Sequence, residues 1–172
     1  YLLPSQLARA ENLVRAGRLE EALDGLGEFA RRNPLAAFEI TEARIRLLAG
    51  AGRTEEALAA YNEALVFKPD EPGLLVGRGT LLEQQGRIEP ALKDMARAAA
   101  IAANDASIIN AYGYTLANRT RRWREAWPLV RRAQELDPGS GAIQDSVGWV
   151  LFGLGRREEA RSHLEEAFQR IP

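Results

Sequence analysis

Residues 141–172, with the sequence GAIQDSVGWVLFGLGRREEARSHLEEAFQRIP, decide the fold. Apolar residues recur at helical spacing up to the pair Gly155-Arg156, where the glycine can end a helix because it adopts positive φ without steric cost. Two glutamates follow this pair and open a second segment, at the end where the helix dipole favours negative charge. Pro172 cannot continue that helix. The stretch therefore predicts two helices joined by a tight turn.

The same pattern returns along the whole chain. Alanine recurs with gaps of 35, 34, 35 and 34 residues, at Ala22, Ala57, Ala91, Ala126 and Ala160. Leucine recurs with gaps of 35, 34, 34 and 35 residues, at Leu13, Leu48, Leu82, Leu116 and Leu151. Turn pairs stand in common register with both series, at Gly17-Arg18, Gly52-Arg53, Gly86-Arg87 and Gly155-Arg156. One such unit cannot bury both of its faces, so neighbouring units must stack into a continuous core.

The pattern x-x-Leu-Gly-x-x-Leu/Tyr … Ala-x-x-x-Phe … Pro at this period resembles the tetratricopeptide repeat (TPR). The last repeat shows it at Gln144, Val147, Gly148, Leu151, Ala160, Leu164, Ala167 and Pro172. The resemblance implies an all-α, right-handed superhelical solenoid of about five helix-turn-helix repeats, at residues 3–36, 38–71, 72–105, 106–140 and 141–172. We expect residues 1–172 to form a single solenoid and to be a fragment of a longer chain.

The composition excludes several classes of function. Cysteine is absent and His163 is the single histidine, so we expect no metal site, no thiol chemistry and no cofactor. The net charge of −1 provides no general attraction for nucleic acid, and no run of eighteen apolar residues predicts a membrane span. The residue types of a hydrolase triad are present at Asp145, Ser146 and His163, but the sequence has no nucleophile-elbow motif around Ser146. We therefore expect a protein without catalytic activity.

The TPR resemblance also implies where a partner binds, because the first helices of these repeats line a concave, protein-binding face. Carried over position by position, the partner-binding residues are Arg46, Thr80, Glu83, Asn110, Tyr114, Asn118, Asp145, Trp149 and Phe152. The last three share one helical face by their spacing of i, i+4 and i+7, and Asn110, Tyr114 and Asn118 make the matching stripe one repeat earlier.

Two interpretations of Tyr114 and Trp149 remain open at this stage. Amides can bond a peptide backbone while aromatic rings bury apolar side chains, which describes a groove for a partner protein or peptide. Alternatively, the rings pack between neighbouring first helices or under a further repeat. The alternation of polar and aromatic residues favours the partner.

A basic turn follows the fourth first helix. Residues 119–132 contain six arginines and one acid, with Trp123 and Trp127 interleaved. The candidate docking surface for an acidic partner consists of Arg119, Arg121, Arg122 and Arg124. The alternative is a solvated turn in which Trp123 caps the hydrophobic core.

Two segments carry a narrower resemblance. NAYGYTLANR at 110–119 and QDSVGWVLF at 144–152 resemble the pair NALGYTLADR and DSxGWVxY of proteobacterial envelope TPR lipoproteins, with departures at Tyr112, Asn118 and Phe152. One member of that group binds and activates a periplasmic C-terminal processing protease and brings cell-wall hydrolases to it. The resemblance implies an adaptor on the periplasmic side of the outer membrane, with any lipid anchor outside this sequence. The alternative is a TPR scaffold of an exopolysaccharide synthesis and secretion complex.

Overall fold

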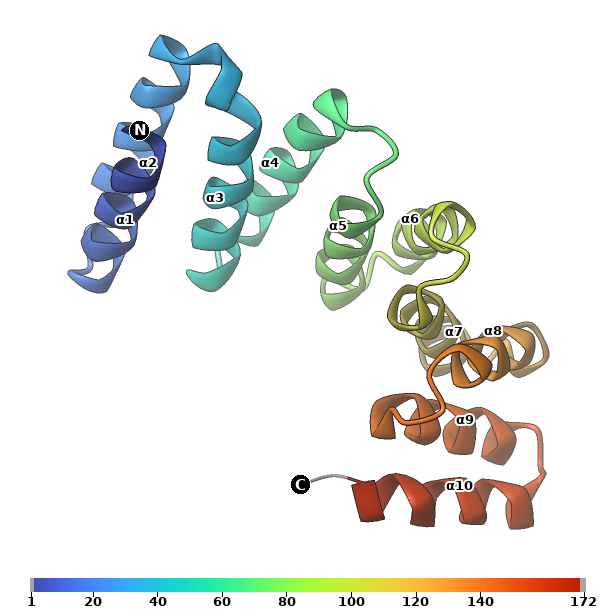
Figure 1. Cartoon of the computed structure of the whole chain (residues 1–172). Coiled ribbons are helices and arrows are strands. Elements are labelled where there is room, and N and C mark those ends of the chain that lie inside the picture. The colour runs from blue at the N-terminus through green and yellow to red at the C-terminus, as the bar shows by residue number, and fades with distance from the viewer. Residues whose placement is uncertain (1, 171–172) are drawn as a thin grey trace. The chain divides into compact units, whose positions relative to one another are not determined.

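The computed structural model describes the backbone of Leu2–Arg170 and the side chains up to Glu165. Within this range it contains ten α-helices, one short 3-10 helix and no strand (Figure 1), which confirms the predicted all-α repeat fold. The elements are α1 (Leu2–Arg15), α2 (Leu19–Arg32), η1 (Pro34–Ala36), α3 (Ala37–Gly50), α4 (Thr54–Phe67), α5 (Pro72–Gln84), α6 (Ile88–Ile101), α7 (Ala106–Thr120), α8 (Trp123–Leu136), α9 (Gly141–Gly153) and α10 (Arg157–Arg170).

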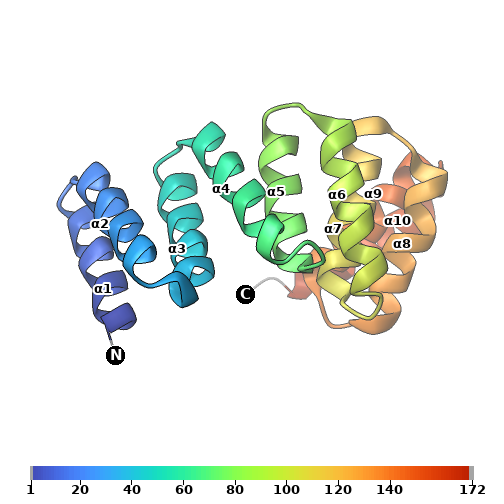
Figure 2. The same cartoon turned by 90° about the horizontal axis from the view of Figure 1, so that it is seen from above.

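The helices form two compact units, one of residues 1–69 with α1 to α4 and one of residues 70–172 with α5 to α10. Within each unit, successive helices pack as antiparallel pairs (Figures 1 and 2). In the second unit, α7 also lies beside both α5 and α9, so the first helices of its three pairs are neighbours.

The repeated small residues form the contact between paired helices. Each member of the alanine series is at most 2% exposed, and Leu48, Leu82, Leu116 and Leu151 are buried as well. Gly113 shows how close the helices come: a Cβ atom there would lie 2.9 Å from Cβ of Leu129 and 3.0 Å from Cγ1 of Val130. A larger residue at this position would have to push α8 away from α7.

Four of the five turns that join the two helices of a pair have a glycine with φ between 72° and 79°, at Gly17, Gly52, Gly86 and Gly155. The fourth turn has Arg121 instead, with φ 56° and ψ 24°. An L-residue with a Cβ atom is disfavoured in this left-handed conformation.

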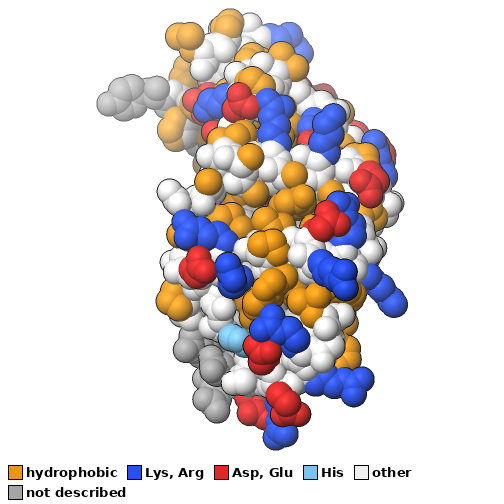
Figure 3. Space-filling model, turned by 90° about the vertical axis from the view of Figure 1, so that its right-hand side faces the viewer, with side chains coloured by type: hydrophobic (Ala, Val, Ile, Leu, Met, Phe, Trp, Pro, Cys, Tyr) orange, Lys and Arg blue, Asp and Glu red, His pale blue; other side chains and the backbone are white. Residues whose placement is uncertain are grey.

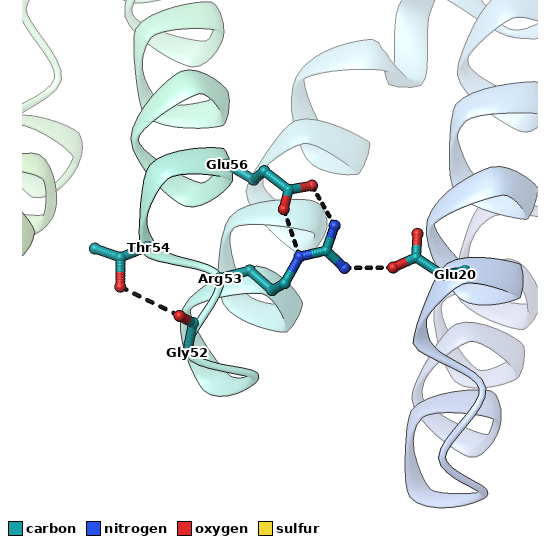
Figure 4. Close-up of polar contacts among 5 residues, drawn as sticks. All are labelled: Glu20, Gly52, Arg53, Thr54 and Glu56. Carbon is teal, nitrogen blue, oxygen red and sulfur yellow. Dashed lines mark hydrogen bonds and ion pairs between the residues drawn. The ribbon is translucent and has the colours of Figure 1, made fainter.

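In four of these five turns, the arginine that follows connects to its surroundings through its guanidinium. It bonds the glutamate three residues later in Arg18–Glu21, Arg53–Glu56, Arg122–Glu125 and Arg156–Glu159. Arg53 also pairs with Glu20 of the preceding helix pair (Figure 4), and the guanidinium carbon of Arg156 lies 4.9 Å from the ring centre of Trp127. In the face shown in Figure 3, basic side chains lie beside acidic ones around a band of hydrophobic side chains.

Two polar contacts are less exposed. Arg78 of α5 donates two hydrogen bonds, of 2.7 and 2.8 Å, to the carboxylate of Asp94 in α6, and the Asp94 side chain is only 10% exposed. The Gln144 amide, which is buried, lies between Gln134 of α8 and His163 of α10, with its Oε1 2.9 and 2.7 Å from their nitrogens.

None of the described helices is long and apolar enough to cross a membrane, and the described residues hold no cluster suited to a metal ion.

Candidate partner-binding site

Three aromatic side chains meet where the α7–α8 turn reaches the end of α9. Trp149 and Phe152, one turn apart on α9, stack with their ring centres 6.0 Å apart and their planes at 13°. Trp123, the first residue of α8, meets Trp149 edge-on at 5.7 Å and 77°. We call these three residues the aromatic cluster. Edge-on and offset-stacked arrangements are the geometries that aromatic pairs favour.

Gly153 makes room for this cluster. A Cβ atom on Gly153 would lie 2.2 to 2.5 Å from three ring atoms of Trp123, so no other residue fits there without moving the ring. Trp123 is partly buried and packs on the core of the second unit, as the capping interpretation of this residue expects. The indole thus fixes α8 against the end of α9 and contacts Trp149.

The outer parts of the neighbouring rings remain exposed. Trp149 and Tyr114 are each 38% exposed and Phe152 is 53% exposed, although all three are carried by packed helices. Asn118 and Asp145 are exposed on the same two helices. We call these five residues of α7 and α9 the aromatic face. It combines rings that can cover apolar groups with an amide and a carboxylate that can bond a peptide backbone or a basic side chain.

Asn110 lies on α7 one turn before Tyr114 and is half-buried. Its Oδ1 atom is buried and has no hydrogen-bond partner among the described residues. A buried acceptor without a donor costs free energy.

The remaining predicted positions have other surroundings. Thr80 of α5 donates a 2.9 Å hydrogen bond to the carbonyl of Val76, and Glu83 of α5 pairs with Arg119 of α7. Arg119, which we predicted as part of a basic docking surface, therefore also joins two first helices. Arg46 is exposed on α3 and belongs to the unit of residues 1–69.

The other three arginines of the predicted docking surface, Arg121, Arg122 and Arg124, do lie together. They surround a hollow of about 350 Å³ with Glu125, and Trp123, Gly153 and Leu154 complete its wall. We call it the arginine hollow. Arg122 binds Glu125 through two hydrogen bonds of 2.8 and 2.6 Å, and this contact lowers the pKa of Glu125 and raises the pKa of Arg122. The sequence analysis missed the part that Gly153 plays; the available signal was this additional glycine, two residues before the turn glycine Gly155.

Comparison with known proteins identifies relatives of the chain. A sequence model of the tetratricopeptide repeat matches residues 7–72 and again residues 42–107. A TPR repeat-containing protein of Pseudomonas aeruginosa is 34% identical over 170 residues, which are 99% of this chain and 29% of that protein. The chain thus spans less than a third of the length of this relative.

Solved structures with the same fold are also known. MamA from Desulfovibrio magneticus superposes with a TM-score of 0.80 at 20% identity, covering 97% of this chain and 93% of that one. YrrB, described as a TPR protein with an unusual peptide-binding site, superposes with a TM-score of 0.75 at 23% identity, covering 97% of this chain and 85% of that one. At these identities the likeness shows the fold alone.

Proposed function

Because this chain belongs to the tetratricopeptide repeat family, we propose that it is a protein-binding scaffold whose aromatic face docks an apolar segment of a partner protein. TPR folds are consistent with protein interaction and in general do not catalyse reactions. One observation carries the assignment to this face: Trp149 and Phe152 stack on each other yet remain 38% and 53% exposed. Tryptophan and tyrosine are the residue types most enriched among interface hot spots.

The exposed ring area is large enough to matter for affinity. An aromatic side chain buries about 150–250 Å², so Trp149 and Phe152 each have roughly 100 Å² left to cover. At about 25 cal/mol per Å², each ring contributes up to roughly 2.5 kcal/mol when a partner covers it. The rings are held by neighbouring side chains on packed helices, so little conformational freedom is lost when the partner binds.

The more specific proposal is an adaptor for a periplasmic C-terminal processing protease, which the chain binds and activates while presenting cell-wall hydrolases to it. Its support is the resemblance to the envelope lipoproteins, and the two segments that carry this resemblance, 110–119 and 144–152, also contain the aromatic face. The adaptor would work on the periplasmic side of the outer membrane, with a lipid anchor outside residues 1–172 and without cofactor, nucleic acid or catalysis of its own.

Calorimetric titration of the chain with the processing protease of the same organism tests this proposal. The Tyr114→Ala/Trp149→Ala variant should lose most of the binding heat while circular dichroism shows retained helix. Leu35→Ala, which removes a 99% exposed apolar side chain from the other unit, is the control and should bind like the wild type. Absence of binding at tens of micromolar would contradict the protease adaptor. The exopolysaccharide-complex scaffold would then be the function to test against the components of that machine.

A further inference from the structure

The arginine hollow is a second binding feature beside the aromatic face. We infer that it binds a carboxylate of an acidic protein segment, and that this segment flanks the apolar segment of the same partner. The inference rests on the proposed function insofar as the occupant is a protein. Its evidence, however, lies in different residues from those of the aromatic face.

The repeats themselves provide the comparison that singles out this turn. The equivalent position is glycine in the other four turns, whereas here Arg121 adopts the left-handed conformation with φ 56°. It is the one non-glycine residue with positive φ in the described part of the chain. Residues held in such unfavourable conformations concentrate at functional sites. No ion pair of Arg121 within the described residues offers a structural reason for an arginine at this position.

The arginine hollow has more positive than negative side chains and therefore favours an anion. Glu125 is bound by Arg122 through both carboxylate oxygens, whereas Arg121 and Arg124 have no acidic partner within the described structure. Arg122 thus pairs in the same way as Arg53 does with Glu56, and Arg121 and Arg124 are the additional cations of this turn. The planar guanidinium matches a carboxylate through two parallel hydrogen bonds, so two arginines around one hollow suit an aspartate or glutamate side chain.

The size and the walls of the hollow favour a peptide over a larger polyanion. Its volume of about 350 Å³ is near the lower end of ligand pockets, which span roughly 300–1,000 Å³, and holds a few side chains at most. Trp123, Gly153 and Leu154 provide an apolar wall for the stem of an acidic side chain or for its neighbour. The net charge of −1 gives the chain no extended basic field of the kind that nucleic acid binding uses.

Trp123 connects the hollow to the aromatic face. The same indole lines the hollow and meets Trp149 edge-on at 5.7 Å. A partner segment whose apolar side chains cover Trp149 and Phe152 therefore continues directly towards Arg121 and Arg124. The geometry thus points to a partner motif in which acidic residues stand next to large apolar residues.

Fluorescence anisotropy with two short labelled peptides tests the inference. One contains two glutamates next to leucine and phenylalanine, and the other has glutamine in place of each glutamate. The wild-type chain should bind the glutamate peptide about tenfold more tightly, as one charge-assisted hydrogen bond predicts, and added salt should reduce this preference. Arg121→Gly and Arg124→Ala should each abolish most of the preference. Arg87→Ala, which removes an arginine from the preceding turn, should retain it.

The Arg121→Gly variant separates binding from folding, because glycine is the residue of the other four turns and should leave the melting temperature unchanged or higher. Equal affinity of the wild type for both peptides, or an unchanged preference in both arginine variants, would overturn the inference. So would binding of phosphatidylglycerol vesicles or of polyuridylic acid that depends on Arg121 while the glutamate peptide does not bind. The Tyr114→Ala/Trp149→Ala variant should bind both peptides more weakly and by the same factor. A loss of affinity for both peptides therefore reports on the aromatic face, whereas a loss of the preference for glutamate reports on the arginine hollow.

Discussion

Replacement of Gly153 by alanine tests whether the aromatic cluster is built as described. The new Cβ atom would lie 2.2 Å from the nearest ring atom of Trp123, so the indole must retreat by about 1.3 Å to reach ordinary van der Waals contact at roughly 3.5 Å. That movement disturbs its edge-on contact with Trp149, a type of contact worth about 0.5–1.5 kcal/mol. Overpacking of a filled site costs about 1–3 kcal/mol in general.

A matched substitution is available in the other unit. Gly50 is the last residue of α3 as Gly153 is the last residue of α9, and a Cβ atom on Gly50 meets nothing within 4 Å. Alanine is favoured over glycine in helices by up to about 1 kcal/mol, so Gly50→Ala should be neutral or stabilising. We expect Gly153→Ala to be about 2 kcal/mol less stable than the wild type, because the clash outweighs the gain in helix propensity.

Urea unfolding followed by both tryptophan fluorescence and circular dichroism measures the effect. All three tryptophans, Trp123, Trp127 and Trp149, lie in the second unit, so fluorescence reports on the repeats that contain the aromatic cluster. Gly153→Ala should lower the midpoint of the fluorescence transition, and Gly50→Ala should not. An unchanged midpoint and an unchanged emission spectrum in Gly153→Ala would refute the close contact between Gly153 and Trp123.

Two further predictions concern ion pairs. Asp94→Ala should lower the free energy of unfolding in urea by about 2 kcal/mol, because it removes a bidentate partner of Arg78 at a largely buried site. Asp70→Ala, at an exposed ion pair, should change the free energy of unfolding by less than about 1 kcal/mol. Equal effects of the two substitutions would contradict the role given to burial. Hydrogen bonds from Arg18, Arg122 and Arg156 lower the pKa values of Glu21, Glu125 and Glu159 from the ordinary value of 4.5. The stabilising effect of these three contacts is therefore complete above pH 4.5 and is lost as the pH falls through the lowered pKa values. The melting temperature should therefore fall on acidification from about pH 6 to about pH 3, and Arg122→Gln should reduce this dependence; an equal dependence in the variant would contradict it.

The periodic part of the fold could be predicted because it depends on local rules. Small residues at a period of 34 or 35 are needed wherever paired helices touch, and the alanine series is accordingly buried from Ala22 to Ala160. The turn glycines follow in the same way from the need for positive φ. Sequence alone therefore identified helix pairs, turns and the buried faces.

Contacts that depend on the stacking of repeats were not predictable. Glu83 and Arg119 are 36 residues apart, and their pairing requires the register of α5 against α7. Trp123 begins α8 and Trp149 lies on the next helix, α9, so spacing on one helix could not bring them together. The left-handed conformation of Arg121 likewise follows from closure of the turn, because the residue type itself disfavours it.

Fluorine NMR of the chain labelled with 5-fluorotryptophan, with and without the processing protease, tests the central claim most directly. The three tryptophans give three resonances, which Trp→Phe variants assign. The account predicts that the resonance of Trp149 shifts or broadens on binding while that of Trp127, which contacts Arg156 and lies outside the aromatic face, changes little. Calorimetrically confirmed binding that leaves the Trp149 resonance unchanged would contradict the assignment of the aromatic face as the partner-binding surface.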